Sequence, residues 1–392
     1  MPHERATPDN REIRVNSKTR LTHALTGKSV DRTPVNFYEV GGFAVDPDAP
    51  DPFNIYNDPS WRPLLELAEN ETDLIRMVAP DARPAADNCR DALFSEKTEE
   101  RDGARYTYRK VRVGGRTLTE TQRRDAGVNT VWQVEHLLKG PDDARAFLEL
   151  PDEVFAYEPD AASIMQAEEA LGDRGLVMVD TGDPLCAAAA LFSMEDYIAM
   201  AYTESALFHR LLEKFARHLY PFVEKTAAAA PGRLWRVYGP EYASEPYLPP
   251  ALFRDYVHEY TTPIIKLIHK HGGMARLHSH GRLRNILPII AEMGADALDP
   301  VEPPPQGDIT LREVRNLYGA DMTLFGNIEV SAIETLESDA FEGLVKNTLR
   351  EVAETSGKGF VLMPTAAPYG RRITANTLRN YETLVRLAKL TP

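Results

Sequence analysis

The chain has 392 residues, of which 43% are hydrophobic and 27% are charged, and its formal net charge is −14. These values are typical of a soluble globular protein. The acidic excess disfavours nucleic acid and anionic membranes as partners, because phosphate groups attract clustered lysine and arginine. The two cysteines, the absence of a secretory leader and the absence of an apolar run of roughly 20 residues exclude a disulfide framework and a membrane span and indicate a cytoplasmic protein.

The first third of the chain predicts a helical start and a β-rich insert. The polar residues 1–17 are expected to be flexible, and residues 18–392 to form one domain. A strand is expected at 35–40, where Gly41-Gly42 ends it. In the stretch of about 103–137, β-branched and aromatic residues surround a Gly114-Gly115 turn, which predicts a small inserted antiparallel β region. Helices are expected around 17–25 and 61–74, and a further strand at 74–79.

From residue 141 onward, helices and strands alternate. The strands are expected at 176–179, 234–238, 274–278, 297–299, 322–325 and 360–362, and the main helices at about 193–228, 250–271, 281–293, 309–318, 331–355 and 373–389. Such alternation is typical of parallel βαβ units. With 35–40 and 74–79, eight strands predict a TIM (β/α)8 barrel of the α/β class with an N-terminal helical extension. The alternative, an open doubly wound sheet, lacks its glycine-rich phosphate loop here.

The pair His278 and His280 is the most informative feature. Residues two apart in an extended segment point to the same side, so both imidazoles leave the end of one strand together. The catalytic groups of parallel barrels lie at that end. Such a pair indicates metal coordination or acid–base chemistry, and the alternative is two histidines that only hydrogen-bond across the strand end.

Carboxylates follow in the next loop. Two histidines and one glutamate form a known catalytic zinc set, so His278, His280 and Glu302 are the predicted metal ligands. Asp299 is expected to orient an imidazole or to take part in catalysis. The alternatives are that Glu302 and Asp299 only cap turns.

Polar residues follow almost every other predicted strand, and a parallel barrel would collect them at one end. Asp180, Tyr238 and Glu241 are predicted catalytic residues along with Asp299; for Glu241, a helix-entry role is equally compatible. Glu39 and Asn327 are predicted to contact substrate. Tyr369, Arg371 and Arg372 follow the last strand, where an arginine can clamp a carboxylate or phosphate. The alternative for both arginines is a surface position at the start of the last helix.

These residues, in this order, resemble the uroporphyrinogen decarboxylase superfamily. The resemblance spans about residues 18 to 388 and rests on RLTHALTGKSVDRTPV at 20–35, on His278-Ser279-His280-Gly281, on Gly326-Asn327-Ile328 and on the helix start near Thr374-Ala375-Asn376. It implies a TIM barrel and divides the expected chemistry between decarboxylases and zinc-dependent methyltransferases that work with corrinoid proteins. A homodimer is also expected from it.

This sequence differs from the motifs of both the decarboxylases and the methyltransferases, and these differences limit the expected function. The decarboxylases carry an arginine-rich stretch after the first strand, but FYEVGGF at 37–43 has no arginine. The methyltransferase zinc motif has a cysteine where His280 stands and a late cysteine near Ala366. Without thiolates the metal would be a harder Lewis acid, which suits oxygen ligands. The sequence predicts a methyltransferase-like enzyme with zinc, an oxygen-bearing small substrate and a possible corrinoid protein. Alternatives are a decarboxylase of a small acid and a non-catalytic binding protein.

Overall fold

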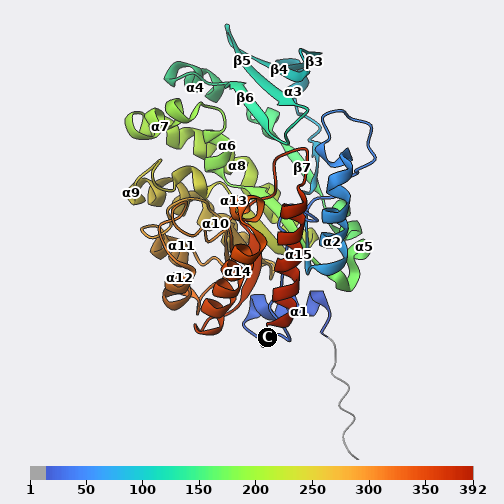
Figure 1. Ribbon diagram of the computed structural model, residues 1–392. Helices are drawn as coiled ribbons and strands as arrows, with labels where there is room; N and C mark the ends of the chain where they lie inside the picture. The colour runs from blue at the N-terminus through green and yellow to red at the C-terminus, as the bar shows by residue number, and fades with distance from the viewer. Residues whose placement is uncertain (1–14, 392) are drawn as a thin grey trace, which may run out of the picture.

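The computed structural model describes residues 15–391, so the predicted flexible segment lies almost wholly outside the described residues. Its centre is a curled, seven-stranded parallel sheet in the order β1-β8-β9-β10-β11-β12-β13 (Figure 1). The strands are β1 Leu74–Val78, β8 Gly175–Gly182, β9 Leu234–Tyr238, β10 Met274–His278, β11 Ala297–Asp299, β12 Thr323–Ile328 and β13 Phe360–Pro364. The predicted TIM-like barrel is confirmed, and so is the strand expected at 74–79.

Helices surround this sheet. They are α1 Ser17–Thr26, α2 Arg62–Glu71, α4 Pro141–Leu148, α5 Ala162–Leu171, α6 Pro184–Ala189, α7 Met194–Thr203, α8 Ser205–Ala229, α9 Pro250–Phe253, α10 Glu259–Lys270, α11 Leu287–Met293, α12 Leu311–Tyr318, α13 Val330–Thr335, α14 Ser338–Ala353 and α15 Ala375–Leu390. The helix predicted at 281–293 begins only at Leu287, because residues 281–286 form the loop that follows β10. Within residues 15–391, no helix combines the length and apolar character that a membrane span needs.

The eighth position of the barrel is filled by a short segment instead of a strand. Val35 forms a parallel bridge with Leu362 of β13, and the N–H of Asp73, just before β1, donates to the carbonyl of Val35 at 2.7 Å. The predicted strand at 35–40 is therefore wrong beyond this point. The side chain of Asn36 accepts the N–H of Tyr38 at 2.9 Å, and this local turn competes with further strand pairing.

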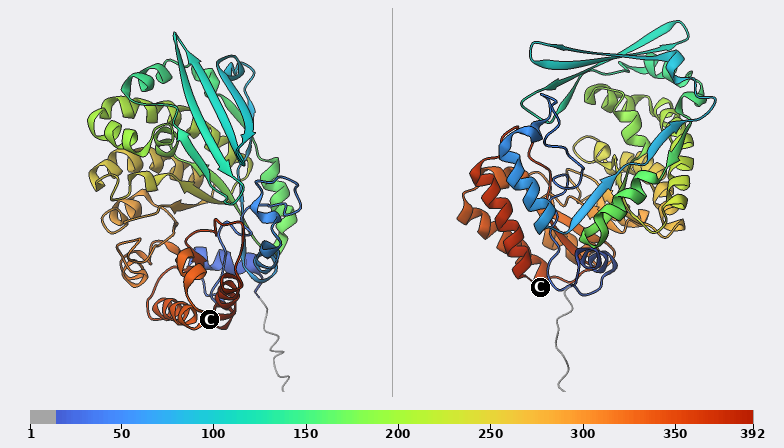
Figure 2. Two further views of the ribbon diagram at one scale, coloured as in Figure 1. Left: turned by 45° about the horizontal axis from the view of Figure 1, so that its top comes forward. Right: turned by 90° about the vertical axis from the view of Figure 1, so that its right-hand side faces the viewer.

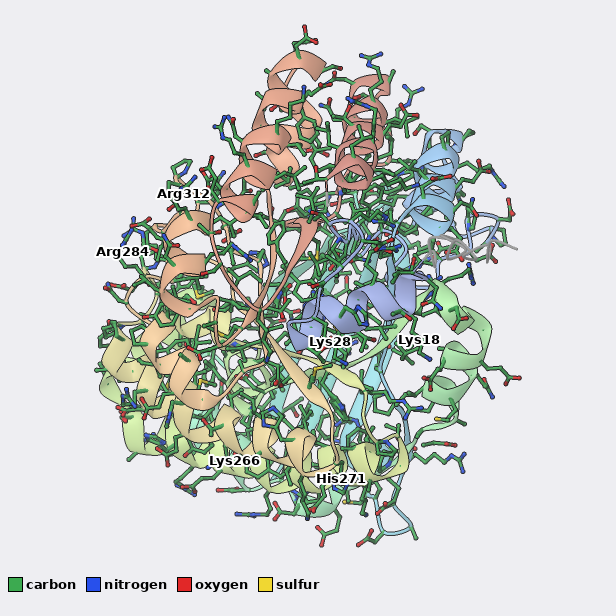
Figure 3. The ribbon with its side chains drawn as sticks, turned by 90° about the horizontal axis from the view of Figure 1, so that it is seen from below. Lys18, Lys28, Lys266, His271, Arg284 and Arg312 are labelled. Carbon is green, nitrogen blue, oxygen red and sulfur yellow. The ribbon has the colours of Figure 1, made fainter. Side chains whose placement is uncertain are left out.

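The interior of the barrel is apolar at its lower end. Inward-facing residues such as Ile75, Met178 and Phe325 form one buried cluster with Leu21 and Leu25 of α1. Figure 3, seen from below, shows α1 lying across the strands between Lys18 and Lys28. This helix closes the amino-terminal end of the barrel, so polar chemistry is confined to the carboxyl end, called the barrel mouth below.

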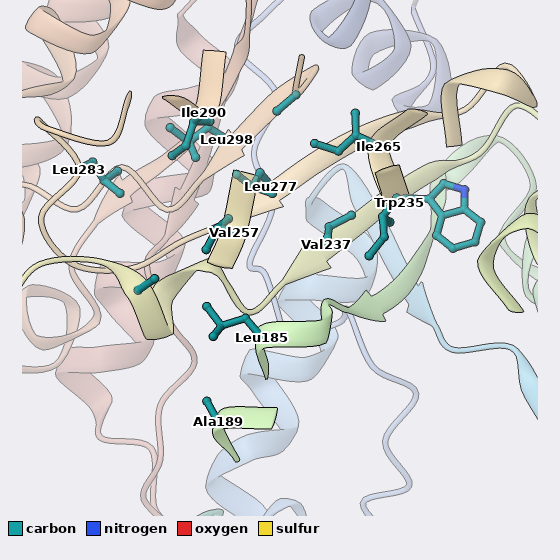
Figure 4. Packing of buried hydrophobic residues seen from close by; sticks show 14 of the residues in the cluster. Leu185, Ala189, Trp235, Val237, Val257, Ile265, Leu277, Leu283, Ile290 and Leu298 are labelled. Carbon is teal, nitrogen blue, oxygen red and sulfur yellow. The ribbon is translucent and has the colours of Figure 1, made fainter. Parts of the chain in front are cut away.

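A second apolar layer lies between the strands and the outer helices. Figure 4 shows part of it, where Val237, Leu277 and Leu298 from three neighbouring strands face Leu185 of α6 and Val257. Leu277 and Leu298 are fully buried. Truncation of a buried leucine to alanine removes about 2–5 kcal/mol of stability, so this layer holds the strands that carry the histidines in place.

The predicted antiparallel insert is present as a four-stranded sheet at the top of the molecule (Figures 1 and 2). Its strands are β3 Phe94–Arg101, β4 Ala104–Val113, β5 Arg116–Asp125 and β6 Val131–Glu135, with the short helix α3 Arg90–Leu93 before them. The sheet thus begins earlier than residue 103, because the charged strand β3 pairs along its whole length with β4. A separate pair, β2 Asp81–Pro84 and β7 Tyr157–Asp160, flanks the insert in the chain.

Candidate active site at the barrel mouth

Two arginines and an aspartate form a polar layer inside the barrel. Asp180 of β8, Arg236 of β9 and Arg276 of β10 are register partners on adjacent strands. An Arg236 Nη1 lies 3.4 Å from Asp180 Oδ1, and its guanidinium lies over the ring of Tyr38 at 5.3 Å and that of Tyr238 at 5.1 Å from the centroids. Arg236 is therefore held by aromatic faces and a single carboxylate.

His278 is fixed by a buried carboxylate. Asp299, fully buried at the end of β11, accepts two hydrogen bonds from Arg276, at 2.6 Å from Nε and 2.8 Å from Nη2. Its Oδ2 also lies 2.9 Å from His278 Nδ1. The ring of Tyr38 stacks on that imidazole, with centroids 5.8 Å apart. Asp299 thus holds Nδ1 of the ring through a hydrogen bond.

His280 has a carboxylate partner of its own. Glu302 Oε1 lies 2.9 Å from His280 Nδ1, and Glu302 Oε2 accepts the backbone N–H of Gly281 at 2.7 Å. The rings of His278 and His280 meet edge to face with centroids 4.7 Å apart. With both Nδ1 atoms held by carboxylates, the two Nε2 atoms are left without a hydrogen-bond partner among the described residues.

The three predicted metal ligands come together but do not form a three-ligand site. Both oxygens of Glu302 are engaged by His280 and Gly281, so they support the imidazole and do not face a shared ion. Across residues 15–391, no group of three His, Cys, Asp or Glu side chains is placed to hold a metal. Zinc remains a prediction from the sequence, and no step below depends on it.

The surroundings shift the pKa values of the two imidazoles in opposite directions. Burial lowers the pKa of His278 despite the neighbouring Asp299, so this ring favours the neutral form. Burial would also lower the pKa of His280, but the hydrogen bond and charge of Glu302, with Asp299 and Glu241 nearby, raise it overall. Pairs of titratable groups pushed apart in this way are typical of acid–base sites.

Further carboxylates surround this pair. Burial raises the pKa of Glu39 and of Asp180, with Arg236 opposing the shift in both. Burial and the charge of Glu302 raise the pKa of Glu329 to about 6. Glu329 Oε1 is buried without a hydrogen-bond partner in the described chain, while its Oε2 accepts from Thr365 at 3.2 Å.

Several other buried polar atoms at this end of the barrel have no hydrogen-bond partner among the described residues, although Asp180 Oδ1 lies 3.4 Å from Arg236 Nη1. They are Asp180 Oδ1, Arg236 Nε, Arg276 Nη1 and Asn327 Oδ1. An unpaired buried polar atom is expensive, so such a concentration indicates a place where a ligand or water completes the hydrogen bonding. Asn327, predicted to contact substrate, is one of these residues.

A cavity of about 440 Å³ opens beside His280. Its wall includes Glu241, whose Oε2 accepts the backbone N–H of Gly239 at 2.8 Å. Tyr238, the other residue predicted after β9, does not line this cavity but contacts Arg236. Burial raises the pKa of Tyr238 to about 12, so it stays a neutral hydroxyl. The predicted catalytic residues therefore divide between the interior layer and the cavity.

The residues after β13 differ in their surroundings. The guanidinium of Arg371 donates to the carbonyls of Pro52 and Ala126, at 2.9 and 2.8 Å, and to Asn57 at 2.6 Å. It therefore ties the insert to the barrel. Arg372 is exposed at the surface. Tyr369 is 53% exposed. Partial burial raises its pKa, and the charges of Glu334, Glu39 and Glu329 raise it further.

Sequence reasoning missed Arg236, Arg276 and Tyr38. Arg236 and Arg276 each lie two residues before a predicted site residue of the same strand, so the alternation of a strand places them on the inner side with Tyr238 and His278. A charged residue at an inward position of an otherwise apolar strand was the available signal.

The fold is a TIM-like barrel whose polar groups gather at the carboxyl ends of its strands. The family model of uroporphyrinogen decarboxylase (URO-D) matches residues 133–368. Because the match covers more than half of the chain, the protein belongs to this family. No curated protein sequence gives a significant match.

Among solved structures, a methyltransferase from Methanosarcina mazei has a similar fold, with a TM-score of 0.54 and 15% sequence identity. The similarity covers 95% of this chain and 98% of that chain. At this identity the likeness shows the shared fold alone. Members of the family include decarboxylases and methyltransferases.

Proposed function

We propose that this chain is a methyltransferase-like enzyme that acts on a small, oxygen-bearing substrate at the His278–His280 pair. The observation that carries the proposal is the pair itself. Each imidazole is oriented by its own carboxylate at Nδ1, at 2.9 Å in both cases, and the two pKa values are shifted in opposite directions. Such a pair can hold a substrate oxygen and deliver a proton to it.

The chemistry follows from the raised pKa of His280. When a nucleophile from the second substrate takes the methyl group, the bond between methyl carbon and oxygen breaks and its electrons stay on the oxygen. Protonated His280 donates the Nε2 proton to that oxygen, and Glu302 stabilises the imidazolium beforehand. General acid catalysis of this kind contributes about 10²–10⁴-fold to a rate. Neutral His278, held by Asp299, is then available to accept a hydrogen bond from a substrate hydroxyl.

The charge at the barrel mouth favours this activity over its alternative. Decarboxylation of a small acid is favoured by the partner-free N–H groups of Arg236 and Arg276, which suit a carboxylate. Against it, carboxylates outnumber the two arginines, and Asp299 already neutralises Arg276. The acidic side chains are Glu39, Asp180, Glu241, Asp299, Glu302 and Glu329. An anionic substrate would be repelled by this set, so decarboxylation is the second candidate.

A corrinoid protein as methyl carrier and a second copy of the chain as dimer partner both stay predictions. The two open Nε2 atoms are compatible with a metal, since ligating histidines are usually held at the other nitrogen by a carboxylate. The present side chains supply only these two nitrogens, which is short of the three protein ligands of a catalytic zinc site.

The test uses the full chain with a panel of methyl ethers carrying a ¹³C-labelled methyl group, a thiol or a reduced corrinoid as acceptor, and NMR detection of the transferred methyl. A parallel panel of carboxylic acids is assayed for carbon dioxide release. The matched variants are His280→Asn and His269→Asn. His269 also pairs with an aspartate, Asp296, at 2.7 Å, but it lies on α10 away from the mouth.

We expect methyl transfer that His280→Asn lowers by about 10²–10⁴-fold, while His269→Asn leaves it unchanged. Carbon dioxide release without methyl transfer would favour the second candidate. Activity of His280→Asn equal to that of the unmodified protein would show that His280 is no proton donor.

A further inference from the structure

The cavity beside His280 has a composition that the proposed reaction does not explain. It is lined by Glu241, Tyr242, Glu245, Pro246, Tyr247, His280, Gly281, Arg282, Pro305 and Gln306. Its volume, about 440 Å³, lies in the range of small-molecule sites. The reacting imidazole occupies one wall, so whatever fills the cavity also approaches His280.

Two glutamates face this space with hydrogen-bonding capacity left. Glu241 uses Oε2 to accept the N–H of Gly239 at 2.8 Å, and Glu245 uses Oε2 to accept the side-chain amide of Asn285 at 2.6 Å. These contacts hold both carboxylates in position. In each glutamate, Oε1 has no partner among the described residues. The two side chains therefore present negative charge that no arginine or lysine within residues 15–391 neutralises through an ion pair.

Two tyrosines supply the other half of the lining. Tyr242 is half-buried, and Tyr247 is 41% exposed at the rim. Burial, with the nearby carboxylate of Glu241, raises the pKa of Tyr242 to about 12, so its ring remains neutral and electron-rich. Tyrosine faces beside carboxylates attract organic cations, because the ring face and the carboxylate are both negative.

Arg282 and His280 are the basic residues of this lining, and neither makes its net charge positive. Arg282 is exposed, so water screens its charge. The charge of His280 is matched by Glu302 at 2.9 Å. Glu241 and Glu245 remain, and the carboxylates deeper in the mouth add to their field.

We infer that this cavity binds the cationic end of the substrate, a methylated ammonium group or a similar organic cation, while the oxygen lies at His280. The inference rests on the proposed function for the role of His280, but the binding of the cation does not. The substrate class would then be a small hydroxyl- or methoxy-bearing ammonium compound. Glu241, Glu245 and the two tyrosines would be its specificity residues.

The probes are choline and 3,3-dimethylbutan-1-ol, its uncharged carbon analogue. They have nearly the same shape, so a difference in their affinities reports the effect of the positive charge. Their binding to the full chain is measured by ligand-observed NMR titration. The variants are Glu241→Gln, Glu245→Gln and Tyr247→Leu, with Glu169→Gln as matched control, since Glu169 is exposed on α5 outside the cavity lining. Circular dichroism of each variant confirms that it is folded.

We expect choline to bind at least tenfold more tightly than its carbon analogue. Either glutamine variant should weaken choline binding several-fold, the two together should remove the preference for the cation, and Glu169→Gln should change nothing. Equal affinity for both probes, no saturable binding of choline, or undiminished binding by the double variant would overturn the inference. Glutamate-dependent choline binding without any methyl transfer would leave the cation site standing and refute the proposed function alone.

Discussion

Replacement of Asp299 by asparagine should weaken the fold more than other single changes at the mouth. Asp299 is fully buried and accepts Arg276 Nε at 2.6 Å, Arg276 Nη2 at 2.8 Å and His278 Nδ1 at 2.9 Å. Asparagine keeps the shape but leaves a fully buried guanidinium without its counter-charge. Removing one partner of a buried ion pair lowers stability by about 3–5 kcal/mol, a large part of the about 5–15 kcal/mol of a typical domain.

Urea unfolding followed by circular dichroism measures this loss. Glu292→Gln is the control, because it removes a solvent-exposed ion pair with Arg254, and its midpoint should not move measurably. The double variant Arg276→Met with Asp299→Leu should recover part of the loss, since both charges are then gone. A change of less than about 0.5 kcal/mol for Asp299→Asn would refute the reasoning, because surface substitutions commonly fall in that range.

The loss of stability in Asp299→Asn should also depend on pH. Burial would raise the pKa of Asp299, but the charges and hydrogen bonds of Arg276 and His278 lower it overall. A carboxyl with a lowered pKa stabilises the fold fully above the unfolded value of about 3.9 and loses that effect as the pH falls. The stability difference between Asp299→Asn and the unmodified protein should therefore be full at neutral pH and shrink below about pH 4. A difference that grows on acidification would contradict the assignment.

Three further outcomes are expected. Glu302→Gln removes the main group that raises the pKa of His280, so the alkaline limb of the kcat/KM profile should move to lower pH; an unmoved limb would show that His280 is not the acid. Arg371→Met should leave the barrel folded but increase amide exchange around Ala126, as measured by mass spectrometry, because three anchoring hydrogen bonds are lost. Leu21→Ala, at a fully buried position of α1, should lower the unfolding free energy by about 2–5 kcal/mol in urea titration.

The alternation of helices and strands was sufficient to predict the barrel from the sequence. The strands from β8 to β13 contain apolar runs that are buried on both faces, so the sequence indicates these strands clearly. The first barrel segment was predicted too long, since the turn at Asn36 is a side-chain effect that an apolar run conceals. Strand β3 was missed because its charged residues face solvent, and only its pairing with β4 makes it a strand.

The sequence could predict that the side chains of the candidate site lie near one another, but it could not predict the hydrogen bonds that Glu302 makes. The residues His278, Asp299 and Glu302 follow neighbouring strands, so sequence order alone brings them together. Which oxygen meets which nitrogen depends on loop geometry, and the N–H of Gly281 lies within 2.7 Å of Glu302. Arg371 shows the opposite limit: it follows the last strand as predicted, but it contacts Pro52, more than 300 positions earlier in the chain, and sequence order does not reveal that contact.

This chain has His280 where the methyltransferase zinc motif has a cysteine, and the difference affects more than the sulfur ligand. A thiolate at this position would need no hydrogen-bond acceptor beside it, so the carboxylate in the next loop could turn toward a metal. An imidazole carries a second nitrogen with a proton, and Glu302 meets that demand at 2.9 Å. Glu302 is then committed to raising the pKa of His280. The pairing of Glu302 with His280, together with the absence of a cysteine near Ala366, separates this site from the thiolate ligand set that the resemblance implies.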